Sequence, residues 1–317
     1  MIKKKRNREK FGNGEYMGKL MTFIKNPVYF ITSAASKGWL DWIPDELYIK
    51  MLYRLKTGES CNLKNPVTYN EKLQWLKLHD RKPEYSEMVD KYEVRGFISR
   101  LFGEEYLIPC FGVYDSFDEI DFQKLPQQFV LKCTHDSGSV VICQDKTNFD
   151  KPAAKAKLEK AMKKNYYSTY REWPYKTVKP RIIAEQFMVD ESGDDLKDYK
   201  IMCFNGTAQV IEVHENRFTE GKTHTQTFYN REWKRLSIEQ IGLPFVKEER
   251  KKPIQMNKML EMSEIIAKDM YHTRVDWYLI NDKIYFGEIT FYDGSGLEPF
   301  PNKEDDLYLG SLIKLSE

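Results

Sequence analysis

Two carboxylates stand in the aromatic, largely apolar C-terminal part of the sequence, where an unpaired charge is unfavourable. Asp276 lies in the sequence RVDW and Glu288 in the sequence GEIT. If these are antiparallel strands joined by the three-residue loop 281–283, Asp276 faces Glu288. Two facing carboxylates repel each other, and a hard divalent cation that also binds phosphate removes the repulsion. Because Thr290 points to the same side as Glu288, the sequence predicts a Mg²⁺ site here, with a solvated surface hairpin as the alternative.

A second group of residues has the chemistry of a phosphate site. The runs 129–133 and 140–143 are rich in β-formers and predict a hairpin, whose loop 134–139 contains Gly138. Backbone N–H groups of such a loop can cradle a phosphate, and Lys132 just before it supplies a positive charge. An ordinary hairpin turn is the alternative.

Further charged residues can serve the same ligand. Lys91 and Arg95 are four residues apart, which predicts one helical face within reach of the phosphates or, alternatively, a solvated charged face. Glu185 ends a predicted strand and can meet an adenine edge, with simple solvent exposure as the alternative. His135 and His214 have no second His or Cys at metal spacing, so the sequence predicts turn or core histidines rather than zinc ligands.

The elements that must position these residues change in character along the chain. Apolar residues at helical spacing from 44 to 79 predict a helical N-terminal region. The later elements are predicted as strands 129–133 and 140–143, a helix over 151–162, a strand over 181–187, strands within 198–213, a helix over 256–270 and strands within 274–292. Helices therefore come first, and a mixed α+β part follows.

Composition and missing motifs exclude several classes of protein. The 317 residues are 41 % hydrophobic, which is too apolar for a disordered chain, yet the apolar runs are too short to cross a membrane. A net charge of +2 gives no overall attraction to nucleic acid. Five widely spaced cysteines without a CxxC pair predict reduced thiols. The absence of G-x-S-x-G, Walker A and G-x-G-x-x-G motifs argues against a hydrolase elbow, a P-loop and a Rossmann site.

The N-terminus is basic, with six Lys and Arg between residues 3 and 10. No apolar segment follows that would make it a secretory signal, so a cytoplasmic location is predicted. A solvated tail is the simpler interpretation of this cluster, and peripheral contact with the anionic inner face of the membrane is the alternative.

Five motifs in order resemble the TupA-like ATP-grasp proteins of cell-surface polysaccharide and teichuronopeptide biosynthesis. They are NPVTYNEKL (65–73), DKYEVR (90–95), FVLKCTHDSG (129–138), DYK (198–200) and GEITFY (287–292). The resemblance covers most of the chain and implies an ATP-grasp fold of the α+β class, in which two lobes grip ATP. The implied parts are a helical N-terminal region (1–85), a lobe with a phosphate lid (86–180) and a lobe with the adenine and metal sites (181–317).

The resemblance also implies a role for each candidate residue. The residues implied in ATP binding are Lys91 and Lys132 on the phosphates, His135, Ser137, Gly138 and Ser139 in a flexible lid, Glu185 and the backbone near Met188 at the adenine, and Asp198 near the ribose. Those implied in chemistry are Lys200 and Arg217, pointing toward phosphate or acceptor, and Arg274, stabilising the transferred phosphoryl group. Asp276, Glu288 and Thr290 match the magnesium positions, although many ATP-grasp enzymes have Asn where Thr290 stands, which puts a second metal in doubt. The loop 294–296 is implied to line the acceptor pocket.

The implied activity is that of an ATP-dependent carboxylate–amine ligase using ATP and Mg²⁺. A carboxylate attacks the γ-phosphate to give an acyl phosphate, and an amine then captures the acyl group. The substrates are predicted to be small molecules or glycans of a cell-surface polysaccharide pathway. A glycosyltransferase, an ATP-grasp sugar kinase and a noncatalytic nucleotide-binding partner are the alternatives, and the sequence predicts no oligomeric state.

Overall fold

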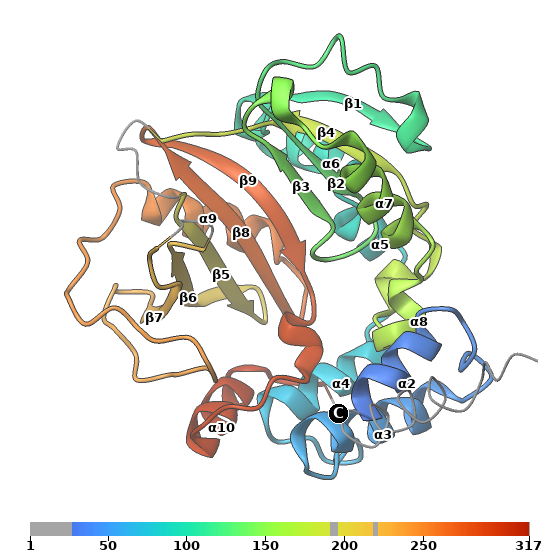
Figure 1. The fold of residues 1–317 in the computed structure, drawn as a ribbon. Coiled ribbons are helices and arrows are strands. Elements are labelled where there is room, and N and C mark those ends of the chain that lie inside the picture. Colours follow the sequence, from blue (N-terminus) through green and yellow to red (C-terminus); the bar gives the residue numbers. More distant parts are fainter. Residues whose placement is uncertain (1–26, 191–195, 218–220, 317) are drawn as a thin grey trace, which may run out of the picture.

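Two antiparallel sheets and a group of helices make up the described part of the protein (Figure 1). The structure is a computed structural model that describes residues 27–190, 196–217 and 221–316. The basic cluster between residues 3 and 10 lies outside the described residues. Within the described ranges, no helix is long and apolar enough to cross a membrane.

The first sheet has four strands in the order β1-β4-β2-β3. Their bounds are β1 Cys110–Tyr114, β4 Ile182–Gln186, β2 Phe129–Cys133 and β3 Val140–Cys143. Helix α7 (Lys151–Met162) packs on β2, and the Asp150 carboxylate caps it by accepting a 2.9 Å hydrogen bond from the Ala153 N–H. The predicted hairpin and helix are therefore confirmed. Because β4 pairs with both β1 and β2, this sheet continues past the boundary predicted at residue 180.

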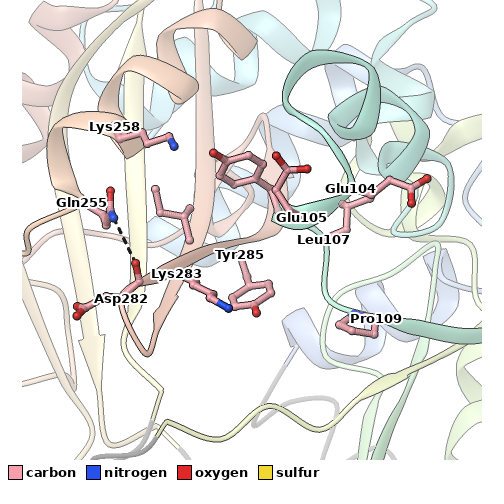
Figure 2. A pocket seen from close by; sticks show the side chains of 11 residues that line it. Glu104, Glu105, Leu107, Pro109, Gln255, Lys258, Asp282, Lys283 and Tyr285 are labelled. Atoms are coloured by element: carbon pink, nitrogen blue, oxygen red, sulfur yellow. Dashed lines mark hydrogen bonds between the residues drawn. The ribbon is translucent and has the colours of Figure 1, made fainter.

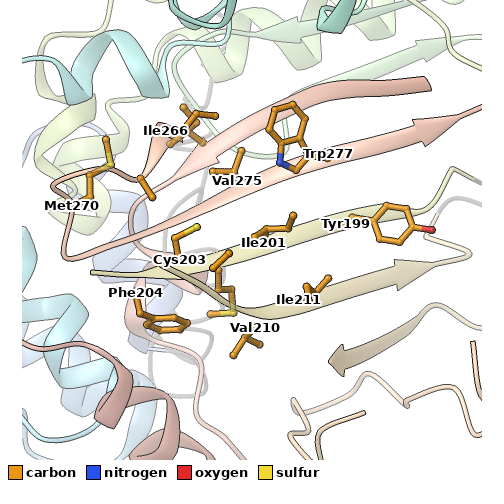
Figure 3. Close-up of a cluster of buried hydrophobic side chains, with 14 of the residues drawn as sticks. Tyr199, Ile201, Cys203, Phe204, Val210, Ile211, Ile266, Met270, Val275 and Trp277 are labelled. Carbon is orange, nitrogen blue, oxygen red and sulfur yellow. The ribbon is translucent and has the colours of Figure 1, made fainter. Parts of the chain in front are cut away.

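The second sheet has five strands in the order β7-β6-β5-β8-β9. Their bounds are β7 Thr225–Asn230, β6 Thr207–Glu215, β5 Asp198–Phe204, β8 His272–Ile280 and β9 Lys283–Thr290. Helix α9 (Met256–Ile266) packs against β5, β6 and β8. Apolar side chains such as Ile201, Val275 and Trp277 form the buried core of this sheet (Figure 3), and the Trp277 indole N–H donates a 2.8 Å hydrogen bond to Ser263 Oγ.

Five of the remaining helices gather below the two sheets in Figure 1. They are α2 Pro27–Ala35, α3 Asp45–Thr57 and α4 Tyr69–His79, joined by α8 Tyr166–Tyr170 and α10 Lys303–Leu312 from later in the chain. Helices α3 and α4 confirm the helical spacing between 44 and 79. A Cβ at Gly310 of α10 would lie 2.4 Å from the Val67 carbonyl oxygen, so only glycine permits this close approach to the start of α4.

The segment between α4 and β1 corrects one prediction. It contains α5 (Tyr85–Val89), α6 (Glu93–Phe102) and the short 3₁₀ helix η1 (Glu104–Tyr106). Lys91 lies before α6, so it does not share a helical face with Arg95. The Asp90 carboxylate explains the difference, because its Oδ1 accepts hydrogen bonds from the N–H groups of Tyr92 at 2.8 Å and Glu93 at 3.2 Å, and the helix starts only after this turn.

The hairpin of β8 and β9 also departs from the prediction. Its turn has two residues, Asn281 and Asp282, and not three, and both have a left-handed φ, at 51° and 61°. A bulge then shifts the register between Val275 and Trp277, so that Arg274 pairs with Thr290 and Val275 with Ile289. This is the register predicted for Asp276 and Glu288. The bulge thus offsets the shorter turn.

Gly287 lies in this bulge, where the two strands approach closely. A Cβ at Gly287 would lie 3.0 Å from the Asp276 carbonyl oxygen, which explains the glycine directly before Glu288. The five cysteines are free thiols, four of them buried, as predicted.

Candidate active site

One face of the five-stranded sheet carries charged side chains at neighbouring register positions. Lys200 on β5 lies opposite Glu212 on β6 and opposite Asp276 on β8. Asp198, two residues earlier on β5, lies opposite His214. Because side chains alternate along a strand, these residues share one face, here called the polar face, while Tyr199 and Ile201 belong to the other.

Buried ion pairs organise the centre of the polar face. Lys200 Nζ donates a hydrogen bond to the Asp276 carboxylate and lies 2.7 Å from Asp198 Oδ2. Arg274 forms a two-point contact with Asp276, with its Nε 2.8 Å from Oδ1 and its Nη2 2.9 Å from Oδ2. Burial and Arg274 lower the pKa of Lys200. The carboxylates of Asp198 and Asp276 raise it by a larger amount, so the pKa of Lys200 lies above its usual value. Lys200 is therefore a fixed positive charge.

Glu288 and Thr290 stand at the open edge of this cluster, on β9. Arg274 Nη2 lies 3.5 Å from Glu288 Oε1 and 3.3 Å from Thr290 Oγ1. Lys91 Nζ lies 4.0 Å from Glu288 Oε2. Partial burial raises the pKa of Glu288, but Lys91, Lys200, Arg274 and Lys132 together lower it to about 2. Glu288 is thus ionised at neutral pH.

The oxygens at this edge fit a magnesium ion. Glu288 and Thr290 make only long contacts with Arg274 and Lys91, which the shorter bonds of a divalent cation, about 2.1 Å, can replace. The Asp276 carboxylate shares Arg274 Nη2 with Glu288, and both of its oxygens accept hydrogen bonds from Arg274. In the described part of the chain, no group of three or more His, Cys, Asp and Glu residues is arranged to hold a metal. Mg²⁺ commonly uses one or two carboxylates and completes its shell with water and phosphate.

A second charged cluster lies on the four-stranded sheet. Glu185 of β4 is 8 % exposed, so the alternative of a solvent-exposed strand end is wrong. Its Oε2 lies 2.8 Å from Lys132 Nζ, and its Oε1 accepts a 3.4 Å hydrogen bond from Arg95 Nη1. Burial lowers the pKa of Lys132, but Glu185 raises it more. Met188 follows β4 and is half-buried.

The loop between β2 and β3 connects the two clusters. Lys91 Nζ donates a hydrogen bond to the Asp136 carbonyl oxygen while it also faces Glu288. Ser139 Oγ donates a hydrogen bond to the Asp136 carboxylate, whereas Ser137 and Gly138 are exposed. Gly138 has a φ of 90° and open space around its Cβ position, so glycine is needed for the backbone conformation and not for room.

His135 and Arg217 occupy opposite margins of the candidate site. His135 is buried in the loop between β2 and β3, and burial lowers the pKa of its imidazole. Arg217 follows β6, is half-exposed and places its Nη1 3.6 Å from Asp198 Oδ2.

The polar face contains residues that sequence reasoning missed. Asp293 accepts a hydrogen bond from Arg274 Nη1, and Glu212 faces Lys200. Side chains alternate between the two faces of the strands on either side of the Asn205–Gly206 turn, and this alternation was the sequence signal that could have placed Glu212 on the polar face. A bulge between Met202 and Cys203 shifts that register by one residue, and simple alternation does not reveal it.

Another missed residue, Lys77 of α4, binds the loop that follows β9. It is fully buried, and its Nζ donates hydrogen bonds to the Ser295 carbonyl oxygen at 2.8 Å and to Ser295 Oγ at 3.0 Å. The short helix η5 (Asp293–Gly296), predicted to line the acceptor pocket, is thus tied to the N-terminal helices.

A pocket of about 560 Å³ lies apart from these clusters, between η1 and the turn of the β8–β9 hairpin (Figure 2). Its wall includes Glu104, Lys258, Asp282 and Tyr285. None of the predicted site residues lines it, so the candidate active site rests on the ion-pair geometry and not on this pocket.

A comparison with known sequence families identifies the chain. Residues 71–314 match the family described as TupA-like ATPgrasp, which is most of the sequence. The chain belongs to the TupA-like ATP-grasp family. In this ATP-grasp protein, the matched span includes every residue of the polar face and of the Lys132–Glu185 cluster. No match is found among the curated proteins.

Solved structures give weaker likenesses to this ATP-grasp protein. D-alanine–D-alanine ligase from Bacillus anthracis complexed with ATP is 14 % identical with a TM-score of 0.37, over 64 % of this chain and 53 % of that one. A RimK domain ATP-grasp protein from Sphaerobacter thermophilus is 11 % identical with a TM-score of 0.39, over 72 % and 69 %. N5-carboxyaminoimidazole synthetase from Staphylococcus aureus is 11 % identical with a TM-score of 0.37, over 72 % and 52 %. The match spans about half of the first ligase, and such low TM-scores are no evidence of a shared activity.

Proposed function

We propose that this ATP-grasp protein is an ATP-dependent ligase that joins a carboxylate to an amine. One observation carries the proposal: Lys91 Nζ contacts the loop between β2 and β3 and also lies 4.0 Å from Glu288 Oε2 on the other sheet. The predicted phosphate-binding groups and the predicted metal ligands are therefore neighbours. A triphosphate between the two sheets would meet cations on one side and the magnesium ligands on the other.

The ATP would be held by groups from both sheets. Lys132 and Lys91 neutralise the phosphates, the loop 135–139 covers them, and Glu185 with the backbone near Met188 meets the adenine. Asp198 lies beside Lys200 and Arg217, in reach of the ribose. Asp276, Glu288 and Thr290 would hold Mg²⁺, which would neutralise charge on the transferred phosphoryl group.

The chain's own residues then orient the reaction. Arg274 is fixed by Asp276 and Asp293, so its guanidinium is a preorganised donor where charge develops on the γ-phosphoryl group. The substrate carboxylate attacks that phosphorus and releases ADP, and the amine displaces phosphate from the acyl phosphate to form an amide. Lys200 holds the Asp276 carboxylate in place during both steps.

We further propose that the substrates belong to a cell-surface polysaccharide or its precursor, with the protein acting in the cytoplasm. Membership of the TupA-like family supports this assignment. Contact of the basic N-terminus with the inner membrane face remains a proposal, because those residues lie outside the described chain.

Ligand-induced thermal stabilisation followed by product analysis tests the proposed function. Saturation at about 100 times the dissociation constant stabilises a protein by about 2.7 kcal/mol, so a clear rise in Tm is expected with MgATP and a smaller one with ATP plus chelator. ADP, phosphate and an amide as products support the ligase. A phosphoester would instead identify a sugar kinase, and stabilisation by a sugar nucleotide alone would identify a glycosyltransferase.

A further inference from the structure

A buried carboxylate oxygen on the polar face lacks a hydrogen-bond partner. Glu212 of β6 is 3 % exposed, and its Oε1 is hydrogen-bonded to His214 Nε2 and to Gln226 Nε2, the latter at 2.7 Å. Its Oε2 has no partner. Gln226 of β7, also 3 % exposed, has an unpartnered Oε1 as well. Two buried acceptors from neighbouring strands are therefore left without a donor.

The orientation of the Gln226 amide is fixed by its partners. Its Nε2 donates to Glu212 Oε1 at 2.7 Å and to Gln240 Oε1 at 2.8 Å, which uses both amide hydrogens. Rotating the amide would place its oxygen against two acceptors. The unpartnered Oε1 is thus a true acceptor, and the missing group must be a donor.

The cations of the polar face leave one oxygen of the Glu212 carboxylate without a donor. The two buried cations of the face are engaged elsewhere: Lys200 by Asp198 and Asp276, and Arg274 by Asp276 and Asp293. Burial raises the pKa of Glu212, but the His214 hydrogen bond, Arg274 and Lys200 lower it to about 2, so Glu212 is an anion. His214 and Gln226 satisfy only one of its two oxygens.

The place of Glu212 suits the second substrate better than the metal. Glu212 lies opposite Lys200, and Lys200 lies opposite Asp276, so two strand spacings, together about 10 Å, separate Glu212 from Asp276. The other proposed magnesium ligands, Glu288 and Thr290, lie one strand further away, on β9. A metal bound to Asp276 and Glu288 cannot also bind Glu212. A substrate whose reacting atom meets an acyl phosphate beside Asp276 can span this distance along the same face.

We propose that Glu212 Oε2 and Gln226 Oε1 form a subsite that anchors the acceptor through an ammonium group, which stays protonated and lies about 10 Å from the amine that reacts. An ammonium group carries three donors and a positive charge, which match two unpartnered acceptors, one of them on an ionised carboxylate. A hydroxyl group in its place would supply one donor and no charge. The inference rests on the proposed function, because the subsite would hold the acceptor of that ligase.

Matched pairs of small ligands test this subsite. Glucosamine is compared with glucose, ethanolamine with ethylene glycol, and 1,4-diaminobutane with 1,4-butanediol. Each is titrated against the full chain saturated with magnesium and a nonhydrolysable ATP analogue, and the rise in Tm gives an apparent Kd. At least one amine is expected to raise Tm more than its alcohol counterpart, and Glu212→Gln should weaken that binding by at least tenfold.

The control variants separate a binding role from a structural one. Glu215→Gln removes a carboxylate on the same strand but on the opposite face, whose oxygens already face Lys197 and Arg250, so it should leave amine binding unchanged. Gln226→Met provides a second lesion of the subsite and should also weaken binding if Glu212→Gln fails to fold.

Failure of the inference is distinct from failure of the proposed function. If the ATP analogue stabilises the protein but no amine exceeds its alcohol counterpart, or potassium chloride at equal ionic strength gives the same shift, the amine subsite is overturned and the ligase proposal stands. An equal shift by amine in wild type and Glu212→Gln also overturns the subsite. Absence of any shift with the ATP analogue overturns the proposed function itself.

Discussion

The two faces of the five-stranded sheet put the same strands to different uses. On one face, Ile201, Val275 and Trp277 are fully buried and pack in an apolar core with α9. On the other, Lys200 and Asp276 are also nearly fully buried, yet both are charged. Burying apolar surface stabilises a fold, whereas burying an ion pair contributes little net stability because desolvation offsets the attraction.

This difference assigns stability to one face and chemistry to the other. Strand alternation lets a single residue step separate the two roles, as Asp276 and Trp277 show. Changes at the exposed edge of the polar face, where Glu288 lies, should therefore alter activity far more than folding, and changes on the apolar face should do the reverse. Removing one partner of a buried ion pair, such as Lys200, should alter both. The following experiments test that division, from the largest expected effect to the smallest.

Glu288→Gln should reduce ATP-dependent turnover by about a thousandfold, because a charged metal ligand acting on the phosphoryl group is lost. The partly exposed side chain makes only long ion contacts, so Tm should change little. The measurement compares the rate of ADP release and the thermal unfolding of both proteins. If Glu288→Gln turns over at the wild-type rate, Glu288 is not a metal ligand.

Trp277→Ala should lower the free energy of unfolding by about 3–5 kcal/mol, as expected for a large side chain lost from a packed core. Urea unfolding gives this value, and MgATP affinity should be unchanged at a temperature where the variant is folded. Ser263→Ala is the matched control, since it removes no aromatic surface and only the two hydrogen bonds of Ser263 Oγ, from Trp277 at 2.8 Å and to the Met259 carbonyl oxygen at 2.7 Å, each worth about 1 kcal/mol. If the folded Trp277→Ala variant no longer binds ATP, the prediction that the apolar face serves only stability is wrong.

Lys132→Met extends the comparison to the other sheet, where it should weaken MgATP binding by about 10- to 100-fold. A hydrogen bond to a charged group contributes about 1.5–3 kcal/mol, and Lys132 is aligned by its 2.8 Å contact with Glu185. Calorimetric titration measures the affinity. Lys157 is an exposed lysine that donates a hydrogen bond to the Val140 carbonyl oxygen of the same hairpin. As the control, Lys157→Met should leave the affinity for MgATP unchanged. Equal effects of both variants would point to general charge instead of a phosphate contact.

His272 provides the smallest test, at the uncharged end of the polar face. It lies between the Tyr69 hydroxyl at 2.9 Å and the Cys203 carbonyl oxygen at 3.0 Å, and burial lowers its pKa from 6.5 to about 3. Between these values the unfolded chain binds the proton and the folded chain does not, so stability is lost as pH falls below 6.5. One such group lowers the free energy of unfolding by at most about 1.4 kcal/mol for each pH unit.

The pH dependence is measured by urea unfolding at pH 7 and pH 5 in wild type and in His272→Gln. The variant should lose less stability between the two values, because it has no imidazole to protonate. Identical losses in both proteins would show that His272 does not titrate on unfolding.

Much of the fold was predictable because its signals are local. The hairpin of β2 and β3, the Asp150 cap of α7 and the Asn205–Gly206 turn all depend on residues close in sequence. Lys91 shows the limit of such reasoning: a four-residue spacing predicted a helix, but the carboxylate of Asp90 delays the helix start until after Lys91.

The candidate site was harder to predict because register errors are not visible in a pattern of residue types. The expected three-residue turn was wrong, and a bulge restored the facing of Asp276 and Glu288. A similar bulge after Met202 places Glu212 opposite Lys200, which simple alternation misses. Bulges depend on local twist and packing and leave only weak traces in a sequence.

The sequence by itself determined which residue types alternate along each strand, and hence that one sheet would have an apolar and a charged face. Only the tertiary structure decided which charges meet. Lys91 reaches Glu288, Lys132 reaches Glu185 and Arg274 reaches Asp293, and no spacing of residues predicted these partners. The reason is physical: alternation is set by the geometry of one strand, whereas an ion pair between distant segments forms only after two packed elements have fixed the positions of both side chains.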